Sequence, residues 1–314
     1  MSKRNSGRNV HGIVLLDKRL GVSSNKALQE VRHLFNANKA GHTGSLDPLA
    51  TGLLPLCFGE ATKVSALMLD DNKRYHVVIQ LGVMTDTGDA EGRVIETRPV
   101  PDLSMEEIHA CLQQFMGEID QIPPMYSALK HNGKKLYELA REGITIDRKA
   151  RQIKIFELKL LSGSQAGAWE PDRLTLEVFC SKGTYIRSLA EDIGRSLGCG
   201  GTVQALRRLE AGLFNIEQAK TIEQMTAMSE QELSKCLIDV DKPLESLPCT
   251  HLSDEQAIAI KYGQSINFNG TPDRISGLWQ GTVRMYHAAV FLGLGEMLLD
   301  GKIAPKKLFN MNNQ

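Results

Sequence analysis

The sequence predicts an α+β protein: a larger domain built on a mixed or antiparallel sheet, followed by a small β-rich module. Strand-like and helix-like segments follow one another without the regular alternation of a parallel α/β fold. Near Pro243 and Pro248 the chain changes from helical and acidic to short strands, glycines and turns. The chain has 314 residues, 42% hydrophobic and 24% charged, as in globular domains. We therefore expect two domains, at 1–248 and 249–314.

Periodicity predicts the first elements of the larger domain. The apolar run Gly12–Lys18 predicts a strand. A helix is expected to begin near Ser23 or Ser24, because one helical face then carries Leu28, Val31, Leu34 and Phe35. Arg74–Leu81 predicts a second strand, and Val94–Glu96 is expected beside it after a turn rich in glycine and aspartate.

The remaining elements complete the domain and the module. Ser104 is expected to cap a helix over Met105–Met116, and the alternation in Leu174–Cys180 predicts a half-buried strand. An amphipathic helix follows from Ile186 and is closed by Gly198. Residues 215–248 are expected to be helical. Beyond them, a compact all-β module of about 65 residues is predicted from its turn signals, which are Tyr262-Gly263, Asn269-Gly270, Gly277, Gly281 and Gly293-Leu294-Gly295.

Composition excludes several classes of protein. The six cysteines show no C-x-x-C spacing, and the eight histidines lack the spacing of two ligands on one helix face, so we expect no metal. No run of 18 apolar residues occurs, and the basic N-terminal segment has no apolar core of a signal peptide. A cytoplasmic protein without a membrane segment is therefore expected.

Charge is balanced overall but uneven along the chain. The formal net charge is zero, which by itself argues against nucleic-acid binding. Residues 130–154, however, carry eight lysines and arginines against three acidic residues. Such a segment can follow a phosphate backbone, or it can be an ordinary solvated helix face.

The loop Gly41–Gly52 holds a single carboxylate, Asp47, among glycines and directly before Pro48. Proline disfavours the helical conformation of the preceding residue, so Asp47 is expected to end a loop and begin a helical turn. There its carboxylate would accept hydrogen bonds from the following N–H groups and stay ionised. The plain alternative is a helix N-cap without chemistry.

Other motifs narrow the chemistry. The chain has no G-x-G-x-x-G or G-x-x-x-x-G-K-[ST] phosphate loop and no G-x-S-x-G nucleophile elbow. Aromatic residues stand beside arginines at Arg74-Tyr75 and Tyr185-Ile186-Arg187. This combination suits stacking on an unpaired base together with a charged partner, although a tyrosine in a strand is more often simple packing.

The sequence closely resembles the TruB family, the bacterial tRNA pseudouridine-55 synthases, over nearly its whole length. The segments that carry the resemblance are Gly41–Lys63, Lys73-Arg74-Tyr75, Gln121–Lys130, Cys180–Arg187 and Leu206–Leu209. The tail is similar to the family's PUA-like RNA-binding module. One departure is Arg19, where the family usually has proline after the Asp-Lys pair.

The resemblance implies a role for each site residue. Asp47 would be the nucleophile that attacks a flipped-out uridine, at C6 or at C1′, and Arg187 would pair with it. Tyr75 would stack on the uracil and assist proton removal at C5. The remaining implied substrate contacts are His42, Tyr185, Leu206 and Lys18.

The resemblance also implies the partners. The substrate would be the T stem-loop of tRNA, and the basic insertion at about 124–154 would close over it. No cofactor is needed, because the product is an isomer of the substrate, and a monomer is expected. Two other functions remain open: a tRNA-binding or tRNA-folding protein without catalysis, and a hydrolase of the glycosidase kind. The first would not need Asp47, Tyr75 and Arg187 together, and the second lacks a paired carboxylate.

Overall fold

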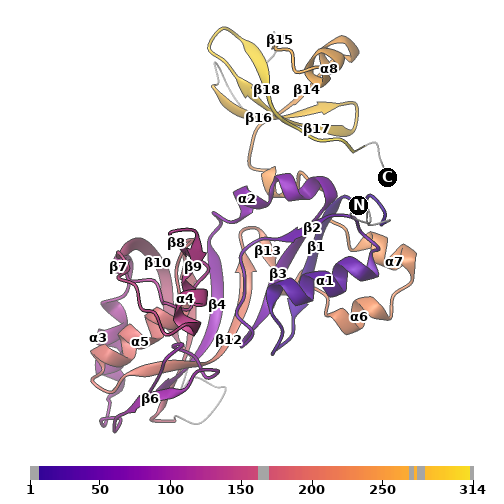
Figure 1. The fold of residues 1–314 in the computed structure, drawn as a ribbon. Helices are drawn as coiled ribbons and strands as arrows, with labels where there is room; N and C mark the ends of the chain where they lie inside the picture. Colours follow the sequence, from indigo (N-terminus) through magenta and orange to yellow (C-terminus); the bar gives the residue numbers. More distant parts are fainter. Residues whose placement is uncertain (1–6, 162–169, 269–271, 274–279, 312–314) are drawn as a thin grey trace.

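The computed structural model describes residues 7–161, 170–268, 272–273 and 280–311. They form a large sheet of nine strands and a separate sheet of five strands from the last quarter of the chain (Figure 1). The α+β class predicted from the sequence is confirmed. The turn signals at Asn269-Gly270 and Gly277 lie outside the described residues. None of the described helices is long and apolar enough to span a membrane.

The large sheet is mostly antiparallel, with one parallel pair between β12 and β3. Its strands lie in the order β1 (Gly12–Lys18), β3 (Ala50–Phe58), β12 (Gly201–Ala211), β4 (Lys73–Leu81), β11 (Arg173–Cys180), β10 (Arg151–Leu160) and β7 (Gly117–Gln121). Two short strands, β2 (Ala40–His42) and β13 (Phe214–Asn215), pair with β3 and β12. The strands predicted at Gly12–Lys18, Arg74–Leu81 and Leu174–Cys180 are present.

The helices of this part are α1 (Ser24–Leu34), α2 (Ser65–Met68), α3 (Met105–Gln113), α4 (Leu136–Arg141), α5 (Ile186–Ser196), α6 (Ile222–Thr226) and α7 (Glu230–Lys235). Short 3₁₀ turns occur at η1 (Gly59–Lys63), η2 (Ile216–Gln218) and η3 (Lys242–Leu244). The caps expected at Ser23 and Ser104 are confirmed, and α5 is closed at Gly198, whose φ is +85°. Residues 215–248 are only partly helical, because their helices are short.

The sequence-based expectations were wrong for the segment after Asp47 and for the partner of Val94–Glu96. No helical turn follows Asp47; a turn leads at Ala50 into β3, whose apolar side chains are buried between β1 and β12. Strand β6 (Val94–Thr97) does not lie beside β4 but pairs with β5 (Val83–Thr85) in a sheet of its own. The physical reason is that both edges of β4 are occupied by β11 and β12, so no hydrogen-bonding edge remains.

The C-terminal sheet has the order β14 (Cys249–His251), β16 (Gly281–His287), β17 (Val290–Met297), β18 (Lys302–Leu308) and β15 (Ile266–Asn267). The module is β-rich but not all-β, because it contains α8 (Asp254–Lys261). Ser253 caps α8, and Gln256 completes a capping box. This helix signal is present in the sequence, but the many glycines and turns around it favoured an all-β prediction.

The module is attached to the larger part by a shared apolar cluster. Phe291, Leu294 and Phe309 of the module belong to the same buried cluster as Ile13 and Leu53 of the large sheet. Hydrogen bonds reinforce this contact: Lys63 Nζ donates to the carbonyl of Leu308 at 2.8 Å, and Lys307 Nζ donates to the carbonyl of Lys63 at 2.9 Å. The C-terminal strand is therefore fixed against η1.

Candidate active site

An ion pair between Asp47 and Arg187 forms the centre of the candidate site. Arg187 is the second residue of α5, and its NH2 lies 2.9 Å from Asp47 Oδ2. The arginine side chain is 7% exposed, whereas the Asp47 side chain keeps 44% of its surface exposed. The carboxylate is thus held by a buried cation and still presents surface to a ligand.

Arg187 is fixed by three further groups. Its NH1 donates to the carbonyl of Thr87 at 2.9 Å, and its NH2 donates to the carbonyl of Tyr126 at 2.7 Å. The buried carboxylate of Asp89 lies 3.7 Å from NH1. Asp89 is itself held by the hydroxyl of Thr87 at 2.6 Å and the N–H of Glu91 at 3.2 Å. The guanidinium therefore has little freedom to turn away from Asp47.

The N-terminus of α5 is also held in place. Gln121, at the end of β7, is buried, and its side-chain amide accepts from the N–H of Tyr185 at 2.8 Å and donates to the carbonyl of Tyr185 at 3.0 Å. Ser188 Oγ donates to the carbonyl of Ile122 at 3.1 Å. These bonds fix both Tyr185 and the first turn of α5, from which Arg187 extends.

The loop that carries Asp47 is held by buried polar side chains. Lys18 is 1% exposed, and its Nζ donates to the carbonyls of Val22 at 2.8 Å and Arg19 at 3.0 Å, with Pro48 at 3.5 Å. Burial lowers the pKa of Lys18 to about 8, while the charge of Asp47 acts in the opposite direction. Lys18 therefore supports the loop through its backbone carbonyls, and the substrate contact expected from the resemblance stays a prediction.

A second buried cation, Arg208, joins this loop to the sheet. Arg208 is 1% exposed; its Nε donates to the carbonyl of Leu53 at 2.7 Å and its NH2 donates to the carbonyl of Gly44 at 3.1 Å. Gly52 has a φ of +97°, and a Cβ there would collide with the backbone of Arg208. Glycine at 52 is thus required by the close approach of β3 to β12.

The expected hydrogen bonding of Asp47 was wrong. Among the described residues the carboxylate has no backbone N–H donor, because Pro48 has none and the N–H of Ala50 donates to the backbone carbonyl of Asp47. Burial among protein atoms raises the pKa of Asp47 above its ordinary value, and Arg187 offsets this only in part. Arg187 is therefore the main group that favours the ionised carboxylate, and the charge of Lys18 acts in the same direction.

Tyr75 on β4 lies within the electrostatic reach of Asp47 and Arg208. Burial raises the pKa of its phenol, Arg208 acts in the lowering direction, and the charge of Asp47 adds to the raising effect. The phenol is thus neutral at physiological pH. A neutral aromatic ring near these charged groups suits stacking on a planar base.

The other expected contacts surround the same place. His42 ends β2, and within the described part of the chain its Nδ1 is buried without a hydrogen-bond partner. Burial lowers the pKa of its imidazole, and Arg208 acts in the same direction. Tyr185 precedes α5, and burial raises its pKa. Leu206 is buried on β12, in register with Ala50 of β3. The role of these three residues as substrate contacts stays a prediction.

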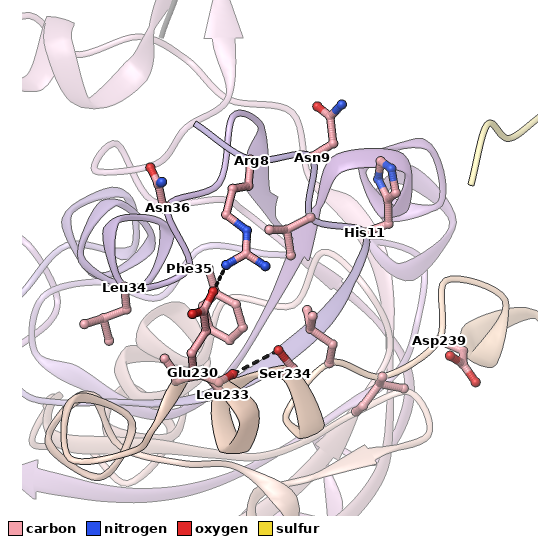
Figure 2. A pocket seen from close by; sticks show the side chains of 13 residues that line it. Arg8, Asn9, His11, Leu34, Phe35, Asn36, Glu230, Leu233, Ser234 and Asp239 are labelled. Carbon is pink, nitrogen blue, oxygen red and sulfur yellow. Dashed lines mark hydrogen bonds and ion pairs between the residues drawn. The ribbon is translucent and has the colours of Figure 1, made fainter. Parts of the chain in front are cut away.

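A separate cavity lies away from Asp47 and Arg187. It has a volume of about 1040 Å³ and is lined by the N-terminal segment, the end of α1 and α7 (Figure 2). Arg8 and Glu230 form an ion pair across it. It contains none of the candidate site residues predicted from the sequence.

Three structural residues of the site were not recognised from the sequence: Gln121, Asp89 and Arg208. Gln121 and Arg208 lie within segments that carry the family resemblance, but their residue types gave no sign that they bind backbone carbonyls and amides. Asp89 lies in a turn that looked like an ordinary polar connection. Only its burial distinguishes Asp89 from other polar turn residues, and the burial of a single turn residue cannot be read from a sequence.

Comparison with known proteins identifies the family. Residues 32–186 match the N-terminal domain of TruB family pseudouridylate synthases, 187–245 match the C-terminal domain of tRNA pseudouridylate synthase B, and 248–309 match the C-terminal domain of pseudouridine synthase II TruB. A protein of Actinobacillus pleuropneumoniae serotype 5b (strain L20) named tRNA pseudouridine synthase B is 50% identical, covering 98% of this chain and 99% of its own. A protein of the same name from Chromohalobacter salexigens is 47% identical, covering 99% and 98%.

Solved structures share the fold. A chain in a crystal structure of an archaeal box H/ACA ribonucleoprotein complex superposes with a TM-score of 0.70 at 23% identity, covering 96% of this chain and 87% of that one. A chain in an H/ACA ribonucleoprotein bound to a substrate RNA containing 2′-deoxyuridine gives a TM-score of 0.69 at 23% identity, covering 96% and 85%. With family models matched along nearly the whole chain and relatives of about half identity, this protein belongs to the TruB family of pseudouridylate synthases.

Proposed function

We propose that this enzyme converts uridine 55 in the T loop of tRNA to pseudouridine, with Asp47 as the nucleophile. The observation that carries the proposal is the partly exposed Asp47 carboxylate held 2.9 Å from the buried Arg187. A carboxylate that is fixed, ionised and open to a ligand is what a nucleophile requires. Relatives named tRNA pseudouridine synthase B support tRNA as the substrate.

The reaction is balanced without a cofactor. Asp47 attacks the uridine at C6 or C1′, the bond between N1 and C1′ breaks, and the base turns within the pocket. A bond forms between C5 and C1′, the proton on C5 leaves, and N1 takes up a proton. Asp47 is released unchanged. Tyr75 is the group proposed to stack on the uracil and to assist loss of the C5 proton, and the walls formed by His42, Tyr185 and Leu206 limit access of water.

The uridine must leave its stack to reach Asp47, at a cost of about a few kcal/mol. His42 is proposed to occupy the space that the base vacates. Contact with the RNA backbone is assigned to the connection between β7 and β10, which forms the hairpin β8 (Lys130–His131) and β9 (Lys134–Lys135) followed by α4. There Lys135 and Arg141 both lie over the ring of Tyr137, at 5.4 and 5.3 Å from its centroid.

The division into a catalytic domain at 1–248 and a PUA-like RNA-binding domain at 249–314 is part of this proposal. So are a monomeric state and a cytoplasmic location, where tRNA is modified. The separate five-stranded sheet of the tail supports the division. Its contact with η1 supports the proposal that the module and the site bind one RNA together.

Asp47→Asn tests the nucleophile. The amide keeps the size of the side chain but is not nucleophilic, so turnover is expected to vanish while tRNA affinity stays within a few-fold. Pseudouridine is mapped by carbodiimide adducts on unmodified tRNA. Asp192→Asn on α5 is the matched control, because this aspartate pairs with Arg195 at the surface and not with Arg187. Turnover of Asp47→Asn at a tenth of wild type or better would contradict the assignment.

The substrate is tested separately. A T-arm hairpin alone is expected to be modified, since a single extruded base and its loop fill the site. The measurement is kcat/KM for the hairpin and for full-length tRNA. A hairpin that is bound but not modified would show that the rest of the tRNA completes recognition, and the proposal for a self-contained loop would be abandoned.

A further inference from the structure

A cluster of metal-ligand side chains lies in the C-terminal module, far in sequence from Asp47. It consists of Cys249, His251 and Asp273, and one ligand atom from each lies within 4.8 Å of the other two. Cys249 Sγ is 3.3 Å from Asp273 Oδ2. The cysteine is half-buried, and the histidine and aspartate are exposed, so the group is open to an ion from solvent.

The backbone positions all three donors. Cys249 and His251 are two residues apart on β14, so their side chains lie on the same face of the sheet. The N–H of Asp273 donates to the carbonyl of Cys249 at 2.8 Å, which fixes the aspartate beside the strand. The backbone therefore brings the three side chains together.

The imidazole is also oriented by its neighbours. The His251 ring stacks on Tyr286 of β16 with centroids 5.6 Å apart and an interplanar angle of 28°. Tyr286 is held in turn, because its hydroxyl donates to Asp241 and accepts from Arg284 NH1 at 3.0 Å. A ring fixed in this way loses less freedom when it binds an ion.

We propose that Cys249, His251 and Asp273 form a binding site for Zn²⁺. Thiolate, imidazole and carboxylate together suit this borderline-soft ion, whereas Mg²⁺ and Ca²⁺ prefer oxygen ligands alone. Tetrahedral zinc with ordinary bond lengths places its ligand atoms roughly 3.3–3.6 Å apart, so only a small closing of the cluster is required. Three protein ligands leave the fourth position to water.

Binding at this site has a defined proton balance and structural effect. The Cys249 thiol gives up its proton to solvent as the sulfur–zinc bond forms, and the hydrogen bond from sulfur to Asp273 is replaced by shared coordination. The ion would tie the segment at Asp273 to β14, an edge strand of the five-stranded sheet. It would stabilise the module directly after Pro248, where the module begins.

The spacing of the ligands explains why the sequence did not reveal the site. Cys249 and His251 are separated by one residue, and Asp273 follows 22 residues later, so no familiar zinc motif is present. The fold creates the cluster by placing the chain around Asp273 against β14.

Cobalt titration of the full chain tests the proposal. The protein is first treated with a chelator, and Co²⁺ is then added while near-ultraviolet and visible absorption are recorded. One equivalent is expected to give a sulfur-to-cobalt charge-transfer band, and Zn²⁺ is expected to displace it. Absence of the band, with no heat of Zn²⁺ binding by calorimetry, would overturn the proposal and leave only the thiol–carboxylate hydrogen bond.

Variants separate this site from adventitious binding. Cys249→Ser is expected to abolish the band, and His251→Gln and Asp273→Asn to weaken binding about tenfold or more. Cys236→Ser is the matched control, because that half-buried cysteine contacts Met228 and is outside the cluster. A band that persists in Cys249→Ser, or affinity unchanged in both other variants, would overturn the proposal. Circular dichroism checks that each variant is folded.

Discussion

Arg187 and Arg74 are both largely covered arginines that face carboxylates, but their surroundings differ. Arg74 meets three glutamates, with Glu157 and Glu177 each at 2.9 Å and Glu210 at 3.2 Å, and its guanidinium lies 4.6 Å from the centre of the Phe179 ring. Arg187 has one close carboxylate, Asp47, and its remaining hydrogen bonds go to backbone carbonyls.

The pKa values of the carboxylates beside the two arginines shift in opposite directions. Hydrogen bonds from Arg74 and Lys159 lower the pKa of Glu157 to about 2, as expected for a surface carboxylate with charged donors. At Asp47 burial outweighs Arg187, and the pKa is raised. A carboxylate whose pKa is raised beside a cation is a candidate for chemistry, whereas a lowered pKa is typical of a structural ion cluster.

Replacing each arginine with methionine should give the largest contrast. Arg187→Met is expected to lower kcat by about a hundredfold or more, because Asp47 then loses the charge that keeps it ionised and oriented. Arg74→Met is expected to lower stability by about 1 kcal/mol, discounted for solvent screening, and to leave kcat unchanged. Pseudouridine formation and urea unfolding measure the two effects. Equal losses of kcat would show that the two clusters do not differ in role.

A pH series should distinguish the Asp47–Arg187 pair from the cluster of glutamates around Arg74. The raised pKa of Asp47 predicts that kcat/KM falls with decreasing pH at a value above 3.8, the ordinary pKa of aspartate. The lowered pKa of Glu157 predicts the reverse for stability: its contribution is complete above pH 4.5 and is lost as pH falls toward about 2. Activity should therefore be lost while the chain is still folded. An acid limb of kcat/KM below pH 3.8 would contradict the assignment.

Replacing each arginine with lysine should give the smallest difference between the two positions, and it tests the geometry of the guanidinium separately from its charge. Arg187→Lys keeps the charge but cannot reach Asp47 and the carbonyls of Thr87 and Tyr126 together, so only part of kcat should return. Arg74→Lys should restore most of the stability, because three glutamates can share one ammonium. Comparison with the methionine variants by the same two assays checks this. Full activity of Arg187→Lys would show that geometry at 187 is unimportant.

Local patterns predicted the parts of the fold that depend on neighbours in sequence. Apolar periodicity and capping residues predicted β1, β11, α1 and the start of α5, because side-chain burial and caps act within a few residues. They did not predict β3 or the partner of β6, since strand pairing depends on which distant edges are free. The family resemblance gave Asp47, Tyr75 and Arg187; their roles remain predictions.

The sequence by itself determined which groups are available: one carboxylate in a glycine-rich loop, tyrosines beside arginines, a basic insertion and a β-rich tail. Only the tertiary structure decided their environment. It paired Asp47 with Arg187 across 140 residues, buried Lys18 and Arg208 against the loop, and put Arg74 on the opposite face of β4 from Tyr75. Desolvation and donor geometry set the chemistry of an ionisable group, and both are properties of the packed chain.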